Sequence, residues 1–224
     1  MTPLGHFWEL VLGTVIALLP LINPLAIAPT FLALTEGDTP ARRNRQLLMA
    51  CVYMIVILVC FLVGGTFIMG FFGISIPGLR IAGGLLVAGI GSGMLMSAPR
   101  AAETAADAAA RAKTDIAFSP LAMPILSGPG AIAVTIGFTS LARGWTDYLA
   151  IILGILTVAV LVYITLRLSG RVVRVVGQTG MNALTKIMGF LILCIGIQFV
   201  VNGVLGIATD PAVLRAIRDA VAGP

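Results

Sequence analysis

Charged residues are scarce in this sequence. They make up 10% of its 224 residues, against 59% apolar residues, whereas a soluble domain carries about 25% charged residues. The scarcity is uneven, because windows such as 47–79 and 187–209 contain no charge at all. About 20 apolar residues in a helix cross the hydrocarbon core of a bilayer. The composition therefore excludes an ordinary soluble domain and predicts an all-α polytopic membrane protein.

Groups that serve catalysis or bind metals are also scarce. The only histidine, His6, precedes the first apolar segment, and the three cysteines lack metal or disulfide spacing. No apolar segment has Asp or Glu at its middle, where cation pumps normally carry a carboxylate. A membrane enzyme normally needs titratable groups near its substrate. We therefore expect neither an enzyme nor a metal site or cofactor, and the net charge of +5 indicates loop orientation rather than nucleic-acid binding.

Six segments are apolar and long enough to cross a bilayer. The predicted helices cover residues 7–34, 47–71, 76–97, 117–141, 148–168 and 184–207. Most Arg and Lys residues lie in or beside the loops after the first, third and fifth segments. Positively charged loops favour the cytoplasm. The sequence thus predicts a multi-pass protein of a bacterial inner membrane, with both termini in the periplasm.

A short sequence occurs twice. Residues 23–30 read NPLAIAPT and residues 128–135 read GPGAIAVT, and a second pair, RIAG at 80–83 and KIMG at 186–189, follows at almost the same offset. Since each half would hold three spans, the second half must enter the membrane from the opposite side. We predict a 3+3 inverted-topology repeat: residues 1–98, a cytoplasmic connecting loop 99–116, residues 117–207, and a C-terminal tail 208–224.

Helix-breaking residues interrupt the repeated sequence. Pro24 in one copy, and Gly128, Pro129 and Gly130 in the other, are expected to break the first and fourth spans. Backbone groups freed inside a membrane are tolerated only where protein or a watery cavity satisfies them. A half-helix N-terminus favours an anion such as a carboxylate, and freed carbonyls suit an ammonium group. The breaks therefore predict a site near the midplane for a neutral zwitterion, although any single proline could be a simple kink.

Polar side chains near the breaks complete this predicted site. Asn23 and Ser127 are placed to add hydrogen bonds to the substrate. Gln198 could also line the cavity, although a hydrogen bond between helices is the alternative role for it. The predicted substrate-binding residues are Asn23, Pro24, Thr30, Ser127, Gly128, Pro129, Gly130, Thr135 and Gln198.

Three segments carry a resemblance to a known family. INPLAIAPTFLALTEG at 22–37, RIAGGLLV at 80–87 and PLAMPILSGPGAI at 120–132 resemble the signature segments of the MarC family. The resemblance implies a six-span bacterial inner-membrane protein that transports small neutral amino acids such as glycine or alanine, as the SnatA type does. The expected partners are then the amino acid, membrane lipid and a coupling ion, H+ or Na+.

Two other functions stay open at this point. The chain could export other small metabolites or drugs, or it could be a membrane protein that regulates or assembles others without transport. Neither the direction of transport nor the oligomeric state follows from the sequence.

Overall fold

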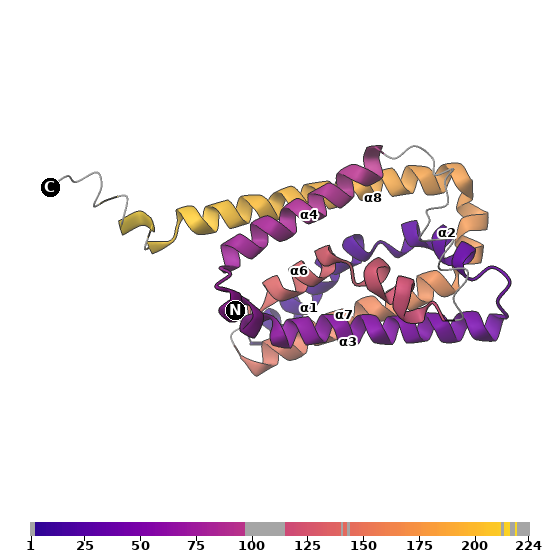
Figure 1. The fold of residues 1–224 in the computed structure, drawn as a ribbon, viewed down its shortest axis with the longest axis horizontal. Helices are drawn as coiled ribbons and strands as arrows, with labels where there is room; N and C mark the ends of the chain where they lie inside the picture. The colour runs from indigo at the N-terminus through magenta and orange to yellow at the C-terminus, as the bar shows by residue number, and fades with distance from the viewer. Residues whose placement is uncertain are drawn as a thin grey trace.

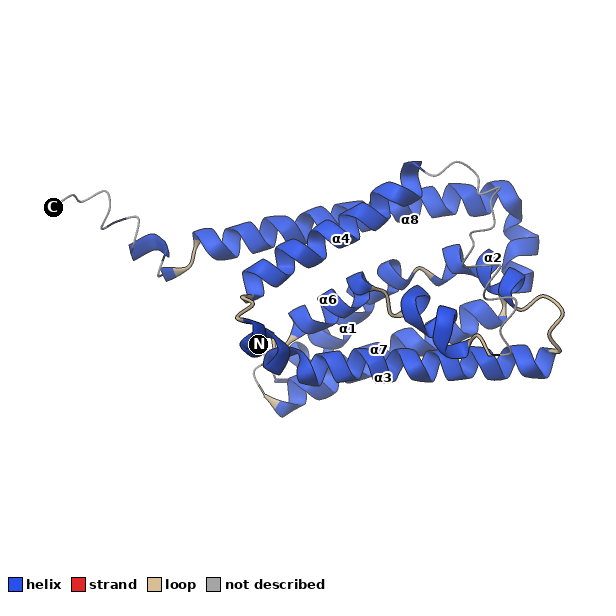
Figure 2. Ribbon diagram, in the orientation of Figure 1, coloured by secondary structure: helices blue, strands red, loops and turns tan. Residues whose placement is uncertain are grey.

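The chain folds into helices alone over the residues that the structure describes. The computed structural model describes residues 3–96, 115–139, 141–142, 144–211, 213–215 and 218, and this part of the chain contains no strand (Figure 2). Its elements are α1 (Pro3–Ile22), α2 (Pro24–Leu34), α3 (Pro40–Phe72), α4 (Ile76–Met96), η1 (Ala117–Leu126), α6 (Pro129–Phe138), α7 (Trp145–Arg167) and α8 (Ser169–Ala208). The predicted all-α fold is confirmed.

The helices have the length and composition of membrane spans. Five of those described can each cross a bilayer, and the bent pair η1–α6 raises this number to six. The helices run roughly along one direction, and the start of α1 and the end of α8 point toward the same end of the molecule (Figure 1). The chain is therefore a polytopic helical protein, as its sequence predicts.

Both predicted breaks are present. α1 ends at Ile22 and α2 begins at Pro24, with Asn23 between them in a left-handed conformation at φ 46°. η1 ends at Leu126 and α6 begins at Pro129, and the two segments are bent by 64°. Proline opens each second half-helix because its fixed φ suits a first helical position, where no N–H is needed.

The fourth predicted span differs from a regular helix before its break. Ser119 and Met123 have extended backbones, at φ −130° and −132°, because each precedes a proline and proline disfavours the helical conformation of the residue before it. The helical turns here are wider than those of an α-helix. The N–H of Leu121, for example, donates to the carbonyl of Ile116, five residues back instead of four, at 3.1 Å. η1 is thus an irregular helical segment.

The connection between the last two spans is helical, and the prediction of a loop there is wrong. Residues 169–183 were expected to form a charged loop, yet α8 starts at Ser169 and runs to Ala208 with one bend at Gly177, where φ is 68°. Arg171 and Arg174 therefore belong to a helix. Charge alone does not end a helix, and within this stretch only glycine permits the left-handed backbone without strain.

The bundle has two layers. Buried residues of α1, α2, α3, η1, α6 and α7 share one core, whereas α4 and α8 lie side by side and meet that core through α6 and α2 (Figure 1). Glycines set the distance between α4 and α8: a Cβ atom built on Gly84 would lie 2.6 Å from the carbonyl oxygen of Gly196. Small residues allow such close backbone approach between membrane helices.

The predicted repeat has a counterpart in the order of the elements. α1–α2, α3 and α4 are followed by η1–α6, α7 and α8, so a broken span opens each half. An inverted relation between residues 1–98 and 117–207 stays a prediction. Most of the predicted connecting loop 99–116 and the end of the tail 208–224 lie outside the described residues.

Candidate substrate site at the two helix breaks

The two breaks lie close together. A Cβ atom built on Gly130, at the start of α6, would be 3.8 Å from Cδ2 of Leu21, and Leu21 lies two residues before Asn23. From this region α2 and α6 run toward opposite ends of the bundle (Figure 1). Both half-helices thus begin there, and helix N-termini carry a partial positive charge.

Asn23 caps the half-helix after the first break with its side-chain oxygen, and its side-chain nitrogen has no described hydrogen-bond partner. Its side-chain oxygen accepts a hydrogen bond from the N–H of Ala26 at 3.3 Å and so caps α2. This bond orients the amide, so the nitrogen Nδ2 points elsewhere. Asn23 is 5% exposed, and within the described part of the chain Nδ2 has no hydrogen-bond partner. A buried donor without a partner is unfavourable, so a ligand that bonded to this amide would stabilise the protein.

The second break also has polar groups without a described hydrogen-bond partner. Gly128 precedes α6, and no described side chain caps this helix, although Gly130 and Ala131 in its first turn are buried. The first N–H groups of any helix have no partner inside that helix. Ser127 is fully buried, and among the described residues its hydroxyl Oγ has no partner. A helix N-terminus whose second and third residues are buried, beside an unpaired hydroxyl, is suited to bind an anion.

Side chains of α4 pack closely against Gly130 at the start of α6. A Cβ atom at this position would lie 3.0 Å from Cγ2 of Val87 and 3.8 Å from Cδ1 of Ile90, both on α4. The sequence prediction did not include these two α4 residues. A signal was present, because Val87 ends the RIAGGLLV segment that resembles the MarC family.

The glycines at the second break do not use their backbone freedom. Glycine permits positive φ at a helix break, yet Gly128 has φ −67° and ψ 167°, and Gly130 lies inside α6. The residue that adopts positive φ is Asn23, at the first break. Asparagine tolerates this conformation better than most residues because its side chain can bond locally.

The remaining predicted residues lie at varying depths. Pro24 is buried at the start of α2, and Pro129 is exposed at the start of α6. Thr30 is half-buried within α2. Thr135 is fully buried, and its hydroxyl donates to the carbonyl of Ala131 at 2.7 Å.

Gln198 stands apart from these residues. It is exposed on α8, and its amide donates to the side-chain oxygen of Asn202 at 2.9 Å. Its place in the site stays a prediction.

The chemistry offered at the breaks is neutral and polar. The residues there, Asn23, Pro24, Ser127 and 128–130, carry no charge. Helix N-termini and the two unpaired side-chain groups offer donors, and the ends of α1 and η1 offer carbonyls. This set matches a small molecule that carries both an anionic and a cationic group.

Comparison with known proteins identifies the family. A family model described as MarC family integral membrane protein matches residues 8–208. The chain belongs to the MarC family.

Curated MarC relatives cover nearly the whole chain. An inner membrane protein MarC of Citrobacter koseri is 45% identical over 208 residues, which are 88% of this chain and 94% of the relative. The protein of the same name from Escherichia coli O1:K1 / APEC is 43% identical over 216 residues, 91% and 97% of the two chains. No solved structure matches with significance. The relatives' names and the apolar helices place this MarC-family protein in a bacterial inner membrane as a multi-pass protein.

Proposed function

We propose that this MarC-family protein is a secondary transporter of small neutral amino acids, of the glycine and alanine type. The substrate binds as a zwitterion between the two helix breaks. The observation that carries the proposal is a pair of buried polar groups without a described partner at the breaks, the Ser127 hydroxyl and the Asn23 amide nitrogen, beside the start of α6, which no described side chain caps. Such groups are unfavourable in the empty protein, and a bound ligand would satisfy them.

The two breaks differ, and the difference assigns the two ends of the substrate. α2 is capped by the side chain of Asn23, whereas α6 has no side-chain cap. The carboxylate therefore binds at the start of α6, where the Ser127 hydroxyl and the Asn23 amide can both donate to it. The ammonium group binds to carbonyls at the ends of α1 and η1.

The size of the substrate follows from the packing around Gly130. A Cβ atom at this position would lie 3.0 Å from Val87 and 3.8 Å from Ile90 of α4, so little room remains on this side of the start of α6. A hydrogen or methyl side chain fits such a site better than a long one, and an uncharged site disfavours acidic or basic side chains.

The architecture suits alternating access. Transporters built from inverted repeats place their site at broken helices between the repeats and rock one part against the other. Here α4 and α8 form a separate layer that meets the core through α6 and α2, so a shift between the layers would move one wall of the site. On this view the protein is not an enzyme, both termini are periplasmic, and H+ or Na+ drives transport.

Exchange in liposomes tests the proposed function. Purified protein is reconstituted with unlabelled alanine inside, and labelled alanine is supplied outside. We expect the label to accumulate transiently, and excess unlabelled glycine, but not glutamate or lysine, to suppress it. The variant Gly130→Val, which fills the space beside the start of α6, should lose this exchange, and Gly137→Ala should keep it, because a Cβ atom at Gly137 meets nothing within 4 Å. Equal label with and without protein would reject amino acid transport and favour export of other metabolites or a role without transport.

A further inference from the structure

A cavity of about 370 Å³ lies at the end of the bundle where α2 ends and α3 begins. Leu34 and Ile116 are buried beside it, and Glu36, Asp38, Arg42 and Gln46 supply its polar lining. We propose that this cavity is a second amino acid site, an entry site that holds the same zwitterion before it reaches the helix breaks. The inference rests on the proposed function, since it names the same substrate.

Gln46 provides the observation that points to a ligand. It lines the cavity, is only 7% exposed, and within the described part of the chain its amide oxygen Oε1 has no hydrogen-bond partner. An acceptor this deeply buried is unfavourable unless it is bonded. An ammonium group, which has only donors, would satisfy it.

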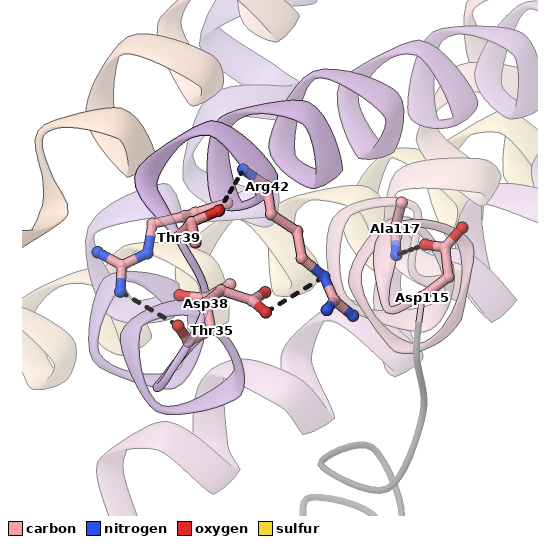
Figure 3. A network of polar contacts seen from close by, with 7 residues as sticks. Thr35, Asp38, Thr39, Arg42, Asp115 and Ala117 are labelled. Carbon is pink, nitrogen blue, oxygen red and sulfur yellow. Dashed lines mark hydrogen bonds and ion pairs between the residues drawn. The ribbon is translucent and has the colours of Figure 1, made fainter.

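The rim of the cavity carries charges of both signs. Asp38 and Arg42 form an ion pair, with Nε of Arg42 3.2 Å from the carboxylate (Figure 3), and the carboxylate of Glu36 is exposed nearby. Arg43 donates to the carbonyl of Thr35 at 3.2 Å, which holds the turn against α3. Glu36 with Gln46 suits the ammonium end of a zwitterion, and the guanidinium of Arg42 suits its carboxylate end.

The position of the cavity links it to the helix breaks. α2 reaches from Asn23 to the cavity, a length of roughly 16 Å for its 11 residues. η1 likewise begins beside Ile116 and ends at the second break. The same two segments that meet at the candidate site thus have their outer ends at the cavity. In Figure 3, Arg42 extends from α3 and lies between Asp38 and the segment that carries Asp115 and Ala117. The predicted topology places this end in the cytoplasm.

Equilibrium dialysis with labelled alanine tests the inference on the whole purified protein in detergent. We expect wild type to bind alanine in two classes, one tighter and one weaker. Gln46→Leu should lose the weaker class and keep the tighter one, and Gly130→Val should do the reverse. Glu36→Gln, an exposed change that should not disturb folding, should weaken the weaker class severalfold. The control is Arg45→Ala, since Arg45 is exposed outside the cavity and should alter neither class.

The outcomes separate this inference from the proposed function. A single class of bound alanine that Gly130→Val removes and Gln46→Leu leaves intact would overturn the entry site and keep the transporter. Two classes that are unchanged by both Gln46→Leu and Glu36→Gln would also overturn the entry site. Absence of any alanine binding would reject the transporter, and the entry site with it.

Discussion

A Cβ atom on Gly130 would lie 3.0 Å from Cγ2 of Val87, so α6 begins directly against α4. This contact joins the broken span of the core to the separate layer formed by α4 and α8. Any side chain at position 130 must displace Val87 or fill the space beside the start of α6. The absence of a side chain here is therefore a requirement of the packing and, on our proposal, of the substrate as well.

Gly130→Val should abolish alanine uptake. The larger side chain would collide with Val87 and occupy the space beside the uncapped helix start, and overpacking of this kind typically costs about 1–3 kcal/mol of stability. Uptake into liposomes is measured beside size-exclusion chromatography of the purified variant. Uptake at the wild-type level by folded protein would move the site away from α6.

Asn23 can be tested with two substitutions that separate side chain from backbone. Asn23→Gly keeps the left-handed backbone at φ 46° and removes the amide, whereas Asn23→Ala removes the amide and adds strain of about 1–2 kcal/mol. Both should weaken alanine binding about tenfold or more, because a hydrogen bond to a charged group contributes roughly 1.5–3 kcal/mol. Only Asn23→Ala should also lower the thermal midpoint markedly. Wild-type affinity in Asn23→Gly would show that the amide does not touch substrate.

Ser127→Ala should separate binding from stability. The Ser127 hydroxyl is fully buried without a described partner, so its removal should leave stability unchanged or raise it by about 1 kcal/mol. Alanine affinity should nevertheless fall about tenfold or more, because a donor to the carboxylate is lost. Thr165→Ala serves as the control, since this exposed hydroxyl on α7 bonds only its own helix, at Leu161. A loss of stability without a loss of affinity would assign Ser127 a structural role.

The sequence predicted the breaks because their causes are local. Pro24 and Pro129 fix φ and remove an N–H wherever they occur, so the positions of the two breaks could be placed from the sequence. The lengths of the apolar segments likewise predicted the spans. Charge was a weaker guide, as the helix through Arg171 and Arg174 shows.

Contacts between distant segments could not be predicted in the same way. That Val87 faces Gly130, and that Gln46 lines a cavity with Ile116, depends on how the spans pack. Nor did the sequence reveal that Asn23 caps α2 while α6 has no side-chain cap, because both copies of the motif begin with a residue that can precede a helix. That difference supports our assignment of the carboxylate.

The contact between α4 and α8 predicts a stability effect away from the site. A Cβ atom on Gly196 would lie 2.7 Å from the carbonyl oxygen of Gly84, and backbone atoms cannot move aside cheaply. Gly196→Ala should therefore lower the free energy of unfolding by about 1–3 kcal/mol, seen as an earlier thermal transition in detergent. Gly89→Ala on α4 meets nothing within 4 Å and should be neutral or slightly stabilising. Equal transitions for both variants would contradict the described packing of these helices.

The proposed inverted topology makes a prediction for reporter fusions. Reporters placed after Asp38 and after Gly170 should both report the cytoplasm, and those after Gly73 and after Gly144 the periplasm. This pattern follows because one span separates Asp38 from Gly73, two separate Gly73 from Gly144, and one separates Gly144 from Gly170. Opposite locations for Asp38 and Gly170 would rule out three spans in each half.

The central claim is that an amino acid binds between the two helix breaks, and a structure determined with bound alanine tests it most directly. We predict density for one alanine at the start of α6, with its carboxylate within hydrogen-bond distance of Ser127 Oγ and Asn23 Nδ2. Alanine bound elsewhere, for example at Gln198 alone, with the groups at both breaks still unpaired, would contradict the account.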